Sequence, residues 1–83
     1  MAVRLHPYAI ERLEERGAEP GEVIETVEQG EQFPAKLGRM GFRRNFRFDG
    51  VWRGKHHATK QIEVFAVQEG DDWLVITVVT RFF

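Results

Sequence analysis

The chain has 83 residues, of which 42% are apolar and 30% are charged, and its formal net charge is −1. It contains no cysteine, which excludes disulfides and thiolate chemistry and fits a reducing cytoplasm. It lacks both an apolar run of about 18 residues, as a membrane span needs, and the apolar stretch of a secretory signal. We therefore expect a single cytoplasmic domain over residues 1–83.

Two short helices are expected in the first 30 residues. Proline is well tolerated at the first helical position, so the first helix should begin at Pro7 and end at Gly17. The second should run from Pro20 to Gly30. Apolar residues recur at helical spacing in each: Ala9, Ile10 and Leu13, then Val23, Ile24 and Val27. With a tight link between them, the two segments predict a helical hairpin.

From Phe33 onward the apolar period changes to that of strands. Residues 42–49 alternate between an apolar and a basic face, and Gly50 is a turn candidate. Residues 60–67 form the next expected strand. A turn at 70–72 leads to 73–83, which is apolar on both faces and therefore either central or covered by a partner. The order predicts an α+β layer fold with two helices and three to four antiparallel strands.

Positive charge is concentrated in one segment. Eight of the twelve basic residues lie in 36–60 with only one acid, a net charge of +7, whereas 1–35 carries −5 and 61–83 carries −3. Aromatic residues are interleaved with these cations, and Trp52 is the best candidate to stack on a base. Such a segment favours a polyanion, either RNA or an acidic protein partner.

The candidate nucleic-acid-binding residues are the cations of this segment. They are Arg39, Arg43, Arg44, Arg47, Arg53 and Lys55. Arginine binds phosphate through two-pronged hydrogen bonds and stacks on aromatic planes. The alternative is that these cations pair with the acids of the N-terminal segment or protect sheet edges from aggregation.

A candidate catalytic set combines two histidines with three cations. His6 at the start of the first helix is a candidate general base, and Arg12 and Arg16 share a helix face on which they could hold a phosphate. His57 is a candidate general acid, with Lys60 stabilising transition-state charge. The alternative for His6 is that it only helps to start the helix. Arg12 and Arg16 could instead form ion pairs on the surface, and His57 and Lys60 could belong to a solvated, basic end of a strand.

Other catalytic chemistry has less support in the sequence. Glu63 is either a catalytic carboxylate or a solvent-facing strand position. The adjacent His56 and His57 point apart on a strand, which makes them poor metal ligands. We therefore expect neither a metal nor a cofactor.

Four segments carry a resemblance to a known family: HPYAIERLEERG, EVIETVEQG, GKHHATKQIEV and DDWLVITVVTRFF. They resemble a bacterial family of domains of unknown function whose layout is similar to that of the RelE/ParE-like toxins. The resemblance implies two helices on one face of a curved antiparallel sheet. It also implies metal-independent ribonuclease activity and an antitoxin as partner.

Two functional hypotheses follow. The first is an RNA-binding domain, extended by the resemblance to a metal-independent endoribonuclease. The alternative is a non-catalytic module for protein interaction or homodimerisation, suggested by the two-faced apolar final strand and by Phe82–Phe83.

Overall fold

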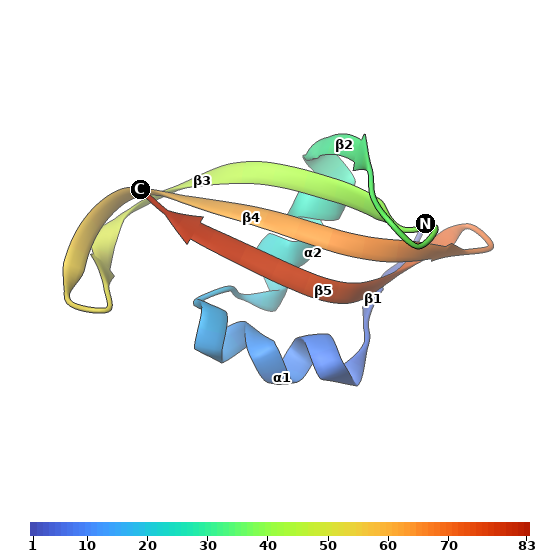
Figure 1. The fold of residues 1–83 in the computed structure, drawn as a ribbon, viewed down its shortest axis with the longest axis horizontal. Coiled ribbons are helices and arrows are strands. Elements are labelled where there is room, and N and C mark those ends of the chain that lie inside the picture. Colours follow the sequence, from blue (N-terminus) through green and yellow to red (C-terminus); the bar gives the residue numbers. More distant parts are fainter.

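The computed structural model describes residues 1–83, which form two helices and one five-stranded sheet (Figure 1). The elements in chain order are β1 (Val3–Leu5), α1 (Pro7–Arg16), α2 (Pro20–Gln29), β2 (Glu31–Pro34), β3 (Met40–Trp52), β4 (Lys55–Glu69) and β5 (Asp72–Phe82). The strands lie in the order β1-β5-β4-β3-β2. The molecule is elongated, with a longest dimension of 41 Å.

The predicted sheet of three to four antiparallel strands is wrong. The sheet has five strands and is mixed, because β1 pairs in parallel with β5 through Val3–Leu5 and Trp73–Val75. The fifth strand, β2, pairs antiparallel with the start of β3. Both additional strands have only three or four residues. Such lengths are too short for alternation to be recognised in the sequence.

The two helices have the bounds and the end signals that the sequence predicts. His6 caps α1, its Nδ1 accepting a hydrogen bond from the Tyr8 backbone N–H at 3.1 Å. Gly17 ends α1 in the left-handed conformation, with φ 69°. In α2, Glu19 and Glu22 form a reciprocal capping box. Local chemistry therefore fixes both helix starts.

The core lies between the helices and one face of the sheet. Figure 1 shows both helices on the same side of the sheet, which leaves its other face without a helical cover. The buried apolar side chains from α1 and α2 are Ala9, Leu13, Val23 and Val27, and those from the three long strands are Phe42, Ile62, Val64, Ala66, Val75 and Val78. Burying each Val, Leu, Ile or Phe side chain contributes about 1.5–3 kcal/mol.

The turn between β3 and β4 lies at Arg53–Gly54, so the turn predicted at Gly50 is wrong. Arg53 and Gly54 have φ of 51° and 80°, as a two-residue hairpin turn of type I′ requires. Gly50 instead lies within β3, beside a register shift, and the neighbouring Asp49 has φ 50°. Bulges increase local bending and twist. Residues 47–58, which we call the hairpin arm, curl towards the helix side of the sheet (Figure 1).

The final strand is central along only part of its length. β5 lies between β4 and β1, but β1 pairs only with Trp73–Val75. The remainder of β5 is a sheet edge beside α1. The predicted central position therefore holds only for the first residues of this strand.

Candidate nucleic-acid interface

The eight cations of residues 36–60 do not form one groove. Four of them have a carboxylate partner within 4.0 Å: Arg43, Arg44, Arg47 and Lys60. The four without such a partner are Lys36, Arg39, Arg53 and Lys55. The first two lie in the β2–β3 loop and the last two at the β3–β4 turn, at opposite ends of β3. Measured along the curled strand, 13 residues at about 3.3 Å per residue make a path of roughly 40 Å between these two ends.

Arg43 belongs to a row of charges across the face of the sheet that the helices leave open. Its guanidinium lies 2.7 Å from Glu63 Oε2, and Arg81 Nη1 lies 2.5 Å from the other oxygen, Oε1. The Glu63 side chain is only 9% exposed. Burial raises the pKa of Glu63, but hydrogen bonds from Arg81 and Arg43 outweigh it and lower the pKa below its usual value. Glu63 therefore has a structural role, in which its carboxylate joins Arg43 to Arg81.

Arg44 and Lys60 are held on the helix side of the sheet. Arg44 Nε donates to Glu25 Oε2 of α2 at 3.0 Å. Lys60 is 6% exposed, and its Nζ donates to Glu22 Oε1 at 2.8 Å and to the carbonyl of Gly17 at 3.0 Å. These bonds commit the ammonium of Lys60, a predicted catalytic residue, to the connection between α1 and α2.

The predicted catalytic residues of α1 are not brought together. His6 precedes the first turn and Arg16 lies in the last turn, so a helix of ten residues, about 15 Å long, separates them. The His6 Nδ1 already accepts the Tyr8 N–H. Arg12 lies over the Tyr8 ring at 4.6 Å. The geometry assigns His6 to helix capping.

The other two histidines lie on the hairpin arm. The His57 ring is 5.7 Å from the Phe82 ring, and His56 Nε2 is 3.5 Å from Asp49 Oδ1. His57 is thus near the C-terminal end of α1, whereas His6 is at its start. A general base and a general acid at these two positions cannot act on one scissile phosphate.

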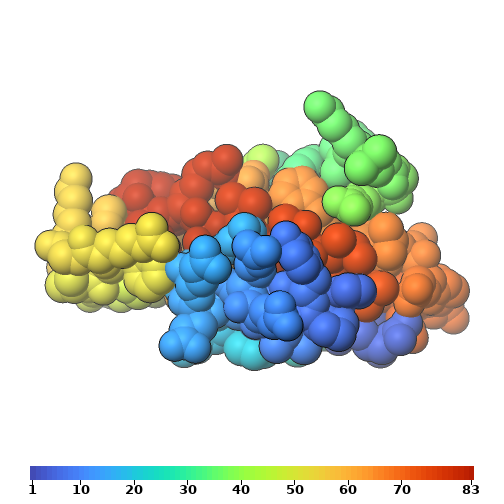
Figure 2. Space-filling model, turned by 60° about the horizontal axis from the view of Figure 1, so that its bottom comes forward, coloured from blue at the N-terminus to red at the C-terminus, as the bar shows by residue number.

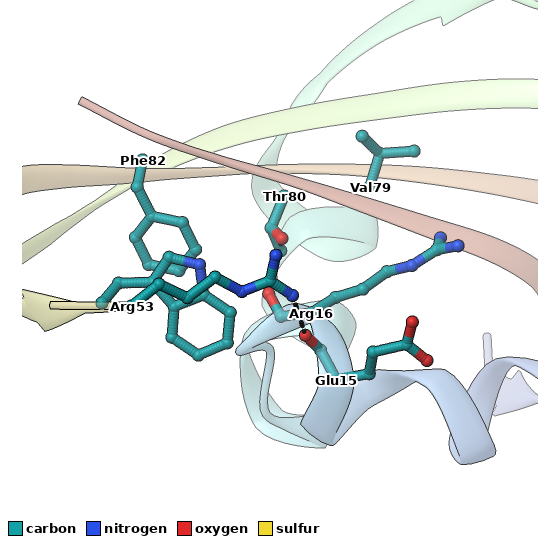
Figure 3. Close-up of a pocket in the computed structure, with 7 residues that line it drawn as sticks. Glu15, Arg16, Arg53, Val79, Thr80 and Phe82 are labelled. Atoms are coloured by element: carbon teal, nitrogen blue, oxygen red, sulfur yellow. Dashed lines mark hydrogen bonds between the residues drawn. The ribbon is translucent and has the colours of Figure 1, made fainter. Parts of the chain in front are cut away.

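A hollow of about 370 Å³ lies where the arm meets the end of α1 and the edge of β5 (Figure 3). Its lining residues are Glu15, Arg16, Trp52, Arg53, Val79, Thr80 and Phe82. Arg16 donates to the carbonyl of Val78, and Arg53 Nη2 donates to the carbonyl of Glu15 at 3.2 Å. Neither guanidinium has a carboxylate partner, and each keeps further N–H donors.

An aromatic column forms one wall of this hollow. The Trp52 ring stacks on Phe82 with centroids 4.8 Å apart and an interplanar angle of 16°. The Arg53 guanidinium lies over Trp52, 5.2 Å from its centroid. Trp52 thus contacts both the Phe82 ring and the exposed guanidinium of Arg53.

No group of three or more His, Asp or Glu side chains is arranged to hold a metal ion. No helix is long and apolar enough to cross a membrane. No family model, curated protein or solved structure matches this chain. The resemblance to the RelE/ParE-like toxins stays a prediction from the sequence.

Proposed function

We propose that this protein binds single-stranded RNA at the arm-end site, defined as Arg16, Arg53 and Lys55 around the column of Trp52 and Phe82. The observation that carries the proposal is the pair of guanidinium groups, Arg16 and Arg53, that share a hollow and have no carboxylate partner. Arg53 also lies over the Trp52 ring, and Arg16 lines the same hollow as Trp52 and Phe82.

The cations of this site suit a phosphate backbone. Arg16 and Arg53 donate to backbone carbonyls, and neither these two arginines nor Lys55 has an ion pair. Backbone hydrogen bonds position Arg16 and Arg53, which reduces the entropy lost when they bind a ligand.

The column supplies a place for a base. RNA-binding proteins stack unpaired bases on aromatic rings and on arginine planes. Because Phe82 already stacks on Trp52, the exposed guanidinium plane of Arg53 beside it is the surface on which we place a base. This refines the expectation that Trp52 itself stacks on RNA.

We propose that the protein binds RNA at this site, and we do not propose that it cleaves RNA there. His6 lies at the far end of α1 from this site, and Lys60 is buried in an ion pair. Two of the predicted catalytic residues, His6 and Lys60, therefore do not line this hollow.

The test is fluorescence anisotropy with a labelled 10-nucleotide RNA between 0.05 and 0.3 M salt. Engagement of three phosphates gives a log–log salt slope of about −2. The double variant Arg53→Ala/Lys55→Ala should weaken binding at least tenfold. Its control, Lys36→Ala/Arg39→Ala, removes the same charge from the other end of β3 and should change the affinity less than threefold. Equal losses in the two variants, or no binding at 0.05 M salt, would refute the site.

A DNA oligomer of the same sequence tests the choice of RNA. Contacts to the 2′-hydroxyl distinguish the two polymers. Tighter binding to RNA supports the proposal, whereas equal binding reduces it to a general site for single strands.

A further inference from the structure

The β2–β3 loop presents an apolar side chain in an unfavourable backbone conformation. Leu37 has φ 62° and is 84% exposed, and Gly38 follows with φ 71°. The Arg39 N–H donates to the Lys36 carbonyl at 3.2 Å, which closes a turn around these two residues. Positive φ at both central positions favours Asn, Asp or Gly, so leucine is a poor choice for this turn. Local backbone strain of this kind is concentrated at functional positions.

An apolar hollow of about 460 Å³ lies beside this loop on the open face of the sheet. Phe33, Phe65, Thr77 and Leu37 are among its lining residues. The Phe33 and Phe65 rings meet edge to face with centroids 5.9 Å apart. No helix packs on this face, and Figure 2 shows the loop (green) standing out from the body at the opposite end from the hairpin arm (yellow).

Two cations border the hollow. Lys36 and Arg39 also line it, and neither lies within 4.0 Å of a carboxylate of this chain. They therefore combine with the apolar walls to complement a ligand that has both carboxylates and apolar side chains. A second copy presenting the same face would bring four unpaired cations together, which disfavours a symmetric dimer here.

We propose that the Leu37 loop and the hollow beside it bind an acidic, apolar segment of a partner polypeptide. Leu37 inserts into the partner, an apolar side chain of the partner fills the hollow between Phe33 and Phe65, and partner carboxylates pair with Lys36 and Arg39. This surface is independent of the arm-end site, since the two lie at opposite ends of β3.

The sharpest variant is Leu37→Asn. Asparagine tolerates the left-handed conformation better than leucine, so this change should raise the melting temperature while removing the apolar anchor. The probe is a display library of random 12-residue peptides selected on the immobilised wild-type protein. Enriched peptides should combine Asp or Glu with Leu, Ile or Phe, and their affinity should fall at least tenfold in Leu37→Asn.

Charge reversal supplies a second, independent readout. Selection on Lys36→Glu/Arg39→Glu should enrich peptides with Lys or Arg in place of Asp or Glu. The matched controls on the arm, Val51→Ser and Lys55→Glu, should retain the original peptides. Val51 is also an exposed apolar residue, at 66%.

Three results would overturn the proposal. The first is enrichment without acidic residues, and the second is unchanged peptide binding by Leu37→Asn. The third is self-association of the wild-type protein in sedimentation that Leu37→Asn abolishes, because it would show that a second copy occupies this surface. RNA binding by the arm is unaffected by any of these results, so the two proposals fail separately.

Discussion

Gly17 leaves the space that the Trp52 ring occupies. A Cβ atom at Gly17 would lie 2.8 Å from Cζ3 of Trp52 and 3.1 Å from Cζ of Phe82. Gly17, which ends α1, is thus also the residue against which Trp52 of the hairpin arm packs. The aromatic column and the helix end depend on each other.

Gly17→Ala should therefore destabilise the protein by about 2–3 kcal/mol. Roughly 1 kcal/mol is the cost of a left-handed conformation without glycine, and overpacking against Trp52 supplies the rest. Chemical denaturation measures the change. Gly70→Ala is the control, since Gly70 has φ 63° but nothing within 4 Å of its Cβ position, and it should cost only about 1 kcal/mol. Equal costs would contradict the packing of Trp52 on Gly17.

Glu63→Gln should lower stability at pH 7 by about 1–2 kcal/mol, because Arg43 and Arg81 lose their shared carboxylate. The folded pKa of Glu63 is lowered, so its stabilisation is fully present above the unfolded value of about 4.3 and is lost as pH falls through the folded pKa. Urea denaturation of both proteins from pH 7 to pH 3 should show the difference shrinking below about pH 4. A difference that stays constant with pH would rule out this linkage.

Lys60→Met should destabilise the fold by about 2 kcal/mol and leave RNA affinity within threefold of wild type. The methionine keeps the apolar stem but leaves the half-buried Glu22 and the Gly17 carbonyl without their donor. Adding Glu22→Gln should recover part of the loss in thermal unfolding. An RNA-binding defect in correctly folded Lys60→Met would instead restore a functional role for this lysine.

His6→Ala should cost about 1 kcal/mol through loss of the α1 cap and leave RNA binding intact. His6→Asn, which keeps a capping acceptor, should be nearly as stable as wild type. Incubation of total RNA with wild type and both variants tests the ribonuclease hypothesis in the same samples. Cleavage by wild type that His6→Ala abolishes would establish the catalytic role that the present geometry does not assemble.

The helices were predictable because their signals are local. Proline at Pro7 and Pro20, glycine at Gly17, and apolar spacing act within a few residues of each other. The sheet was only partly predictable. β1 and β2 are too short to show a period, and the parallel pairing of β1 with β5 joins residues about 70 positions apart.

The candidate site, like the sheet, was only partly predictable from the sequence. The net charge identified residues 36–60 as basic. A count of charges does not say which acidic side chain each cation meets in the fold, so the ion pairs of Arg43, Arg44 and Lys60 could not be anticipated. Alternation correctly placed Phe42 in the core. The contact of Trp52 with Phe82 depends on the curl of the arm, and Arg53–Gly54 was the one local turn signal that could have located that curl.

The placement of β5 between β1 and β4 sets the order in which a growing chain can complete its structure. The helices are synthesised well before β5, the strand against which α1 packs. Until residues 72–82 emerge, β1 has no neighbour and the apolar stripe of α1 stays exposed to solvent. The layer of α1 on the sheet can therefore form only late, after the long-range pairing of β5 with β1 and β4 becomes possible.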